Sequence, residues 1–301
     1  MADSSRRRRW CFLGVLLATG LLATSVENWC GRAPAFAAST PSVAARRQPR
    51  TALAAGGAAG LPTLYVYDHC PFCIRARMIF GLKGIKYNLV FLANDDVETP
   101  TALVGKKLVP ILELPGQAPM GESLDIVRKI DEDEQWGAPV LKPDSGREDI
   151  KAWNKRVSGA MRLLVRPRYP KGFFPEFAFR RARLAFVRNH PIANPENGEI
   201  PDKPTWFDMG PKVWEAWYDA HMGNTPALLK ELNEALKDAE GLIDSEESVS
   251  PGGLSYDDIV FWDRLRGATL VKGIEFGPKV KAYLERMSEK CDVPLLTDIA
   301  M

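Results

Sequence analysis

The sequence predicts an α/β domain followed by an all-α domain, both preceded by a targeting leader. Three observations predict this order: an arginine-led apolar segment near the N-terminus, a β-forming segment that runs into a Cys-Pro helix start, and apolar residues at helical spacing in the second half. The 301 residues suffice for two domains and a short appendage. We place the leader at 1–61, the α/β domain at 62–135, a linker at 136–146 and the all-helical domain at 147–301.

The leader has the layout of a signal peptide followed by a transit-like segment. Arg6 to Arg9 precede an uncharged, mostly apolar run at 10–26, and small residues at 33–35 stand before Phe36, as at a cleavage site. Residues 28–67 contain no acidic side chain and are rich in Ala, Arg, Ser and Thr, as transit peptides are. A plain secretory signal or an uncleaved anchor is the alternative, because the apolar run is near the minimum length of a membrane span.

Composition and charge exclude several classes of protein. With 46% hydrophobic and 26% charged residues, the chain is an ordinary globular protein. The net charge of +2 hides a basic leader, so the rest is mildly acidic and lacks the basic surface expected for nucleic-acid binding. Of five cysteines, Cys11 and Cys30 lie in the leader; one close pair and the single Cys291 are too few for a disulfide framework.

Residues 62–135 show the element order of a thioredoxin-like domain. β-forming residues at 63–67 precede Cys70-Pro71 and a helical pattern, and a second strand is expected at 86–92. A short helix at 99–104, strands at 109–112 and 116–120, and a helix from Ser123 follow. The resulting order is β-α-β-α-β-β-α.

Cys70 and Cys73 form a Cys-Pro-Phe-Cys motif at the start of the first helix. Pro71 suits a first helical turn, so Cys70 is expected at the helix N-terminus, where free N–H groups and the helix dipole stabilise a thiolate. The spacing allows the two sulfurs to approach within disulfide range. We interpret Cys70 as the nucleophile and Cys73, inside the helix, as the cysteine that resolves a mixed disulfide.

A zinc site is the competing interpretation of the two cysteines. It needs two further ligands at matching spacing, which His190, His221 and Cys291 do not provide, so no metal is expected. His69 is expected to pack or face solvent rather than act as a base, because adjacent loop residues usually point apart. The role of Arg77 stays open between a cation near the sulfurs and a solvated helix charge.

The chain resembles the bacterial glutaredoxin 2 family over nearly everything after residue 61. The resemblance rests on YDHCPFCIRARMIFGLK at 67–83, NDDVETP at 94–100, VPIL at 109–112, ESLDIV at 122–127, LSYDDI at 254–259 and the closing segment 295–301. Such proteins join a thioredoxin-like half to an all-helical half like that of glutathione transferases. They use glutathione to reduce protein disulfides and protein-glutathione mixed disulfides, so the resemblance implies this fold, this activity and glutathione as co-substrate.

The resemblance also implies roles for individual residues. Cys70 and Cys73 match the active-site pair. Val109-Pro110 matches a cis-proline step, at which the backbone of Val109 pairs with the cysteinyl part of glutathione.

Glu122 and Ser123 match the pair that holds the γ-glutamyl end of glutathione. Side-chain chemistry agrees, because a hydroxyl and free N–H groups at a helix start suit a carboxylate, while Glu122 suits an ammonium group. The alternative for Ser123 is a helix N-cap that binds no ligand.

Residues 147–301 carry helical core stripes at 150, 153, 157, 161 and 164, and at 228, 232, 235, 239 and 242 after a Thr225-Pro226 start. Residues 255–258 resemble a capping box with aspartate in place of glutamate. Cys291 is expected to be an inert structural thiol. A basic cluster is expected to form a solvated face, with a cleft wall that attracts glutathione as the alternative: Arg162, Arg166, Arg168 and Lys171.

The sequence departs from the family at the leader and at 190–207, which reads as an inserted loop. A glutathione transferase-like conjugating enzyme or a prostaglandin-synthase-like relative is the alternative on the same architecture, although conjugating transferases do not need Cys73. A membrane-inserting glutathione-binding protein is disfavoured, because no apolar run after the leader is long enough to span a bilayer.

The expected partners are glutathione and disulfide-bearing or glutathionylated proteins, and the mature chain is expected to be a monomer that binds neither nucleic acid nor membranes. The bipartite leader resembles those of algae with secondary, red-lineage plastids. A glutathione-using dithiol also needs a reducing compartment. We therefore predict a plastid protein, with the secretory pathway as the alternative.

Overall fold

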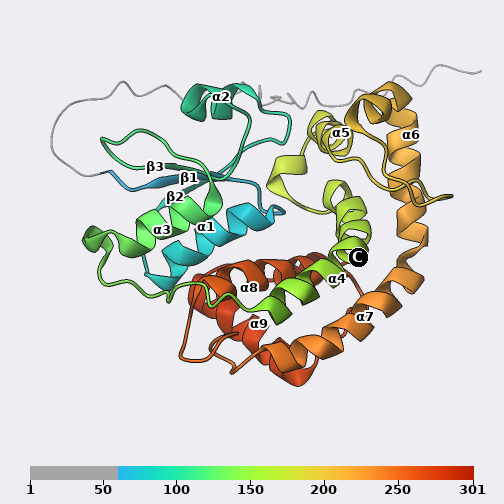
Figure 1. Ribbon diagram of the computed structural model, residues 1–301. Helices are drawn as coiled ribbons and strands as arrows, with labels where there is room; N and C mark the ends of the chain where they lie inside the picture. The colour runs from blue at the N-terminus through green and yellow to red at the C-terminus, as the bar shows by residue number, and fades with distance from the viewer. Residues whose placement is uncertain (1–59) are drawn as a thin grey trace, which may run out of the picture. The chain divides into compact units, whose positions relative to one another are not determined.

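The computed structural model describes residues 60–301, drawn in colour in Figure 1. The expected signal peptide, the expected transit-like segment, Cys11 and Cys30 lie outside these residues. The described chain begins with a small α/β half and continues into a larger helical half (Figure 1).

The α/β half is built on a three-stranded sheet in the order β2-β1-β3. Strand β1 pairs in parallel with β2 and antiparallel with β3. The helices α1 and α3 pack side by side on one face of the sheet, and α2 lies on the other (Figure 1). The elements are β1 Thr63–Val66, α1 Pro71–Leu82, β2 Asn88–Phe91, α2 Glu98–Val104, β3 Ile111–Glu113 and α3 Ser123–Glu132.

The expected strand at 116–120 is reduced to a single bridge between Leu112 and Met120. Each residue donates its N–H to the carbonyl oxygen of the other, at 2.8 and 2.9 Å. Pro119 has no N–H to donate, and α3 begins only three residues after Met120, so the pairing cannot extend. Apart from this strand, the predicted order of elements is confirmed.

The helical half consists of six α-helices and short 3-10 turns within the described residues. Both predicted core stripes lie on helices, α4 and α7, which pack against each other. Helix α6 is interrupted at Gly210, whose φ of 78° lies in the region that favours glycine. The helices are α4 Glu148–Arg168, α5 Arg180–Asn189, α6 Lys203–Gly223, α7 Thr225–Leu242, α8 Tyr256–Ala268 and α9 Pro278–Cys291; the turns are η1 Glu134–Trp136, η2 Tyr169–Lys171, η3 Pro175–Phe177 and η4 Thr297–Ile299.

The inserted segment 190–207 is a loop only as far as residue 202, so the expectation of a loop is wrong for its last five residues. Helix α6 starts at Lys203 because Asp202 caps it: an Asp202 side-chain oxygen accepts the N–H of Thr205 at 2.8 Å. Pro204 lies in the first turn, where its missing N–H costs nothing.

The capping box at the start of α8 is confirmed. The N–H of Ser255 donates to Asp258 at 2.8 Å, and the fully buried Asp258 also accepts the N–H of Val249 and the hydroxyl of Tyr283. Burial raises the pKa of Asp258. The cap therefore anchors α9 and the segment before α8 as well as the helix itself.

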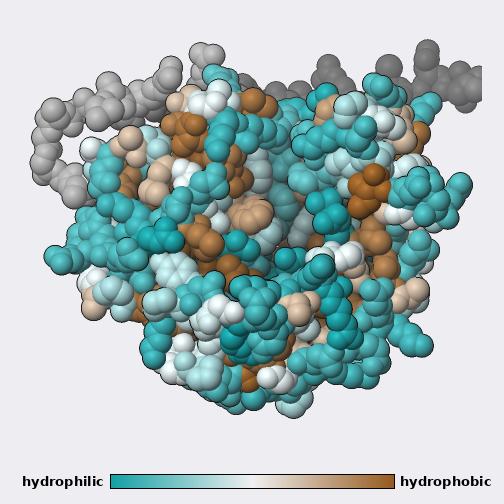
Figure 2. Space-filling view, in the orientation of Figure 1, coloured by the Kyte–Doolittle hydropathy of each residue, from teal (hydrophilic) through white to brown (hydrophobic). Residues whose placement is uncertain are grey.

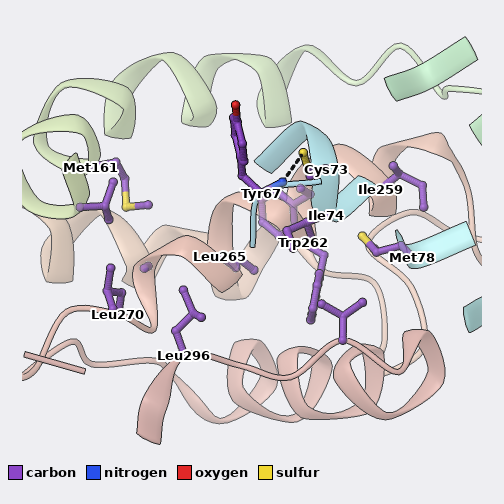
Figure 3. Close-up of a cluster of buried hydrophobic side chains, with 14 of the residues drawn as sticks. Tyr67, Cys73, Ile74, Met78, Met161, Ile259, Trp262, Leu265, Leu270 and Leu296 are labelled. Carbon is purple, nitrogen blue, oxygen red and sulfur yellow. Dashed lines mark hydrogen bonds between the residues drawn. The ribbon is translucent and has the colours of Figure 1, made fainter. Parts of the chain in front are cut away.

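The two halves share a hydrophobic core at the contact of α1 with α8 and α9. Figure 3 shows Ile74 and Met78 of α1 among Ile259, Trp262 and Leu265 of α8. Helix α1, which starts directly after Cys70 and contains Cys73, thus packs against both halves. The segment between β1 and α1 is therefore positioned by the helical half as well as by the sheet.

Candidate active site

Cys70 is the N-cap residue of α1, directly before Pro71 in the first turn. Its backbone is extended, with φ −81° and ψ 120°. The Cys70 side chain is partly exposed, whereas Cys73, one turn into the helix, is fully buried. The structure thus places both cysteines where the sequence puts them, and both are free thiols.

The two thiols differ strongly in acidity. The pKa of Cys70 is lowered to about 7 by a hydrogen bond from the Cys73 thiol, and further by the charge of His69 and by nearby backbone N–H groups, against burial, which raises it. Burial raises the pKa of Cys73 well above its ordinary value. The backbone N–H of Tyr67 donates to Cys73 Sγ at 3.3 Å (Figure 3). Near pH 7 the partly exposed Cys70 is therefore a thiolate in about half of the molecules, whereas Cys73 keeps its proton.

A cleft of about 750 Å³ opens beside Cys70. The α/β half lines it with Cys70, Pro71 and Val109, and the helical half with residues of α4, α5, α8 and the start of α6. Figure 2 shows this face of the molecule, hollowed between the two halves, with both hydrophilic and hydrophobic residues around the hollow. Of the expected site residues, Cys70 and Val109 line the cleft directly.

The peptide bond between Val109 and Pro110 is cis, as expected from the motif. Pro110 is buried at the start of β3, while Val109 is partly exposed and lines the cleft. The main chain of Val109 therefore borders the same cavity as Cys70.

Ser123 is the first residue of α3 and is buried. Glu122, with φ 64°, occupies the N-cap position and makes no capping bond, so the interpretation of Ser123 as a plain N-cap is wrong. Within residues 60–301 the Ser123 hydroxyl has no hydrogen-bond partner, and the exposed side chain of Glu122 is paired with Lys106, at 3.3 Å. Neither residue lines the cleft; both lie at the opening of α3.

His69 is buried, as the packing interpretation requires. Its ring Nδ1 lies 2.6 Å from Oε1 of Glu176, which also accepts the His69 backbone N–H at 2.9 Å. Glu176 is fully buried in η3. Five aromatic rings surround the imidazole: Tyr67, Tyr169, Phe174, Phe177 and Phe186. The sequence analysis missed this carboxylate, because no local pattern links two residues so far apart.

Arg77 is buried and pairs with Asp68, so neither open interpretation describes it fully. Its Nη1 lies 2.5 Å from Asp68 Oδ1. Arg266 of α8 donates to the same carboxylate at 3.1 Å and to the Asp68 carbonyl oxygen at 2.9 Å. Two arginines thus fix the loop that leads into Cys70.

The basic cluster at 162–171 is only partly the solvated face that was expected. Arg162 and Lys171 are exposed, and Lys171 pairs with Asp219. Arg162 also lines the cleft, together with the half-buried Arg166, as in the alternative interpretation. Arg168 is buried and donates to the main-chain oxygens of Leu164 and Met301, so neither interpretation describes it. Helical periodicity cannot tell a face that meets water from one that meets a cleft.

Among residues 60–301 there is no cluster of three or more side chains suited to hold a metal ion. No helix in this part of the chain is both long and apolar enough to span a bilayer. Cys291 is buried, and burial raises its pKa to about 12, in agreement with an inert thiol.

A thioredoxin-like sheet, an acidic cysteine at a helix start and an all-helical half across a cleft define a two-domain thiol-disulfide oxidoreductase. Residues 201–300 match the model of the glutaredoxin 2 C-terminal domain, and residues 69–133 match that of the glutathione S-transferase N-terminal domain. Glutaredoxin 2 of Escherichia coli K12 is 35% identical over 240 residues, which cover 79% of this chain and 99% of that protein. The chain belongs to the glutaredoxin 2 family.

Solved structures agree with this membership. The glutaredoxin 2 of Salmonella typhimurium, determined in complex with glutathione, superposes with a TM-score of 0.68 at 35% identity and covers 81% of this chain and 100% of its own. The glutathione transferase GSTFuA3 of Phanerochaete chrysosporium, at 14% identity and a TM-score of 0.50, covers 77% of this chain and 98% of its own and shares the fold. The expected fold class and the expected glutaredoxin are both confirmed.

Proposed function

We propose that this protein uses glutathione to reduce protein-glutathione mixed disulfides and protein disulfides through Cys70 and Cys73. The observation that carries the proposal is the unequal pair of thiols: an accessible Cys70 of lowered pKa faces the cleft, and a buried, protonated Cys73 stands behind it. The Salmonella relative was determined with glutathione, which supports the same co-substrate here.

On a mixed disulfide the reaction needs Cys70 alone. The Cys70 thiolate attacks the glutathione sulfur, the S–S bond breaks, and the substrate leaves as a thiolate that takes up a proton. A second glutathione, as its thiolate, then attacks the glutathione sulfur bound to Cys70. This step releases oxidised glutathione and restores the Cys70 thiolate, so atoms and electrons balance.

On a protein disulfide Cys73 has a task as well. Attack by Cys70 links the enzyme to the substrate and frees one substrate thiolate. Cys73 gives up its proton, which the freed thiolate can accept, and displaces the second substrate sulfur from Cys70. The resulting Cys70–Cys73 disulfide is reduced by two glutathione molecules.

Glutathione is held along the α/β half. The backbone of Val109 pairs with its cysteinyl part beside Cys70, and the unpartnered Ser123 hydroxyl with Glu122 receives the γ-glutamyl end. Each part of this proposed glutathione site has an unusual backbone: the peptide bond before Pro110 is cis, and Glu122 has a positive φ.

Turnover of a glutathionylated peptide, followed as oxidised glutathione, tests the proposal. We expect glutathione-dependent release of the peptide thiol. An arylating electrophile in the same assay distinguishes the conjugating alternative: conjugation with no reduction of the peptide would contradict a glutaredoxin.

The protein acts in a plastid, as a monomer, after removal of residues 1 to about 60, which carry the signal-like and transit-like segments. A fluorescent reporter fused to residues 1–61 tests the location. Accumulation in the plastid is expected, and secretion of the reporter would contradict it.

A further inference from the structure

The helical side of the cleft carries four cations, here called the basic wall: Arg162 and Arg166 of α4, Lys203 at the start of α6, and Arg264 of α8. Within residues 60–301 none of the four is paired with a carboxylate. The single carboxylate that lines the cleft, Asp263, is already paired with Arg75. The basic wall is therefore a concentration of uncompensated positive charge.

Some cations outside the cleft have carboxylate partners. Arg156, on the same helix as Arg162, pairs with Asp238, and Arg180 and Arg181 of α5 pair with Glu215 and Asp95. The four cations of the basic wall have no such partner among residues 60–301, and all four line one cleft.

Two arginines of the basic wall, Arg166 and Arg264, are partly withdrawn from water, whereas Arg162 is exposed. Burial lowers the pKa of Arg166, and the nearby charge of Arg162 lowers it further. Arg166 Nη1 donates to the carbonyl oxygen of Pro191 at 3.0 Å, so the inserted loop holds this side chain in place. Arg264 Nε is buried without a hydrogen-bond partner. Like charges that are close, partly dehydrated and incompletely bonded are stabilised by a bound anion.

The basic wall is separate from the residues expected to bind glutathione. Val109 lines the cleft from the opposite, α/β half, and Glu122 and Ser123 lie outside its lining. Two of the features that shape the basic wall, Lys203 and the carbonyl of Pro191, come from the inserted segment 190–207. The cleft thus offers a second ligand position beside Cys70, with its own chemistry.

We infer that the basic wall binds carboxylates on the sulfur compound that exchanges with Cys70, and so selects disulfides flanked by acidic residues. The inference rests on the proposed function. The same carboxylate chemistry could be presented by acidic residues of a protein substrate or by the second glutathione, which carries two carboxylates.

Two glutathionylated peptides test the inference: one with glutamates on both sides of the modified cysteine, the other with glutamines at the same positions. With the full-length chain we expect kcat/KM to favour the glutamate peptide on the order of tenfold at low salt, and the preference to shrink as salt is added. In Arg162→Gln/Arg166→Gln the preference should fall towards one. Arg156→Gln, on the exposed part of the same helix, should keep it.

The outcomes separate the two sources of carboxylate. If the wild type prefers the glutamate peptide, and the double variant loses this preference but keeps the same KM for glutathione, the basic wall binds acidic substrates. If the wild type shows no preference, and the double variant has a raised KM for glutathione, the basic wall binds the second glutathione. Equal peptide rates in the wild type together with an unchanged KM for glutathione in the variant would overturn the inference.

Two features keep the test independent of folding and of the proposed function. The ratio of kcat/KM for the two peptides, and its dependence on salt, are measured on the wild type and need no variant. If the double variant fails to fold, Lys203→Gln replaces it, because Lys203 lies at an exposed helix start. Failure of the proposed function would appear as absent turnover of both peptides, which differs from equal turnover of the two.

Discussion

Glu176 accepts two hydrogen bonds from His69 through one oxygen: Oε1 lies 2.6 Å from the ring Nδ1 and 2.9 Å from the backbone nitrogen. The contact ties the residue directly before Cys70 to the turn η3 of the helical half. The contact also fixes the ring of His69 next to Cys70, whose pKa is lowered in part by the charge of that histidine.

Replacing Glu176 with glutamine should raise the pKa of Cys70 above its value of about 7. The amide keeps the shape of the side chain but removes the carboxylate that pairs with the ring of His69, so the effect of His69 on Cys70 should weaken. The ultraviolet absorbance of the thiolate, followed against pH in the wild type and in Glu176→Gln, measures the shift, because the raised pKa of Cys73 keeps that thiol protonated in the same range. Glu196→Gln, on the exposed part of the inserted loop, is the matched control. Identical titration curves for all three proteins would show that Glu176 acts only in packing.

The rate of reaction with a neutral alkylating agent should follow the ionisation of Cys70. Since its pKa is lowered, the thiolate fraction rises with pH and is half-complete near pH 7. Cys73 and Cys291 have raised pKa values and should react only at much higher pH. Mass spectrometry of the alkylated peptides checks the order. Preferential labelling of Cys73 at neutral pH would contradict the acidity proposed here.

Ser123→Ala should weaken glutathione binding without weakening the fold. The Ser123 hydroxyl has no protein partner within residues 60–301, so its removal should change the free energy of unfolding by less than about 0.5 kcal/mol. Loss of a bond to a charged carboxylate should raise the KM for glutathione on the order of tenfold. Steady-state kinetics and urea unfolding of one preparation give both quantities. An unchanged KM would remove Ser123 from the glutathione site.

The sequence predicts those parts of this molecule that depend on neighbours along the chain. Helical spacing located α4 and α7, and the Asp258 capping box located the start of α8, because each pattern acts within a few residues. The His69–Glu176 contact spans 107 residues and has no such pattern. The cleft position of Arg166 has no such pattern either: periodicity shows that its face is not core, but only the packing of α4 against α6 and α8 shows that this face borders a cleft.

Gly81→Ala should destabilise the protein although alanine favours helices. A Cβ at Gly81 would collide with the carbonyl group of Cys291, where α1 passes the end of α9. The clash involves backbone and cannot be relieved by a rotamer, so we expect a loss on the order of 1–3 kcal/mol. Gly159→Ala in α4 meets no atom within 4 Å. That control should stabilise by about 0.5–1 kcal/mol. Denaturant unfolding of both variants measures the difference, and equal effects would contradict the close approach of α1 and α9.

The two cysteines should divide the labour between two classes of substrate. Cys70→Ser should abolish every redox activity, because a serine hydroxyl is not ionised at neutral pH and cannot attack sulfur usefully. Cys73 is fully buried, and its raised pKa keeps it protonated, so it does not start the reaction. It is needed only to break the mixed disulfide between Cys70 and a substrate protein.

Cys73→Ser should therefore keep much of the activity on glutathionylated peptides and lose most reduction of protein disulfides. The same substitution also removes the thiol whose hydrogen bond contributes most to lowering the pKa of Cys70, so the remaining activity should need a higher pH than in the wild type. Rates on both substrates, measured against pH for the wild type and each variant, test the two effects together. If Cys73→Ser were as inactive as Cys70→Ser on both substrates at every pH, resolution could not be the task of Cys73, and the reaction on mixed disulfides would require both sulfurs.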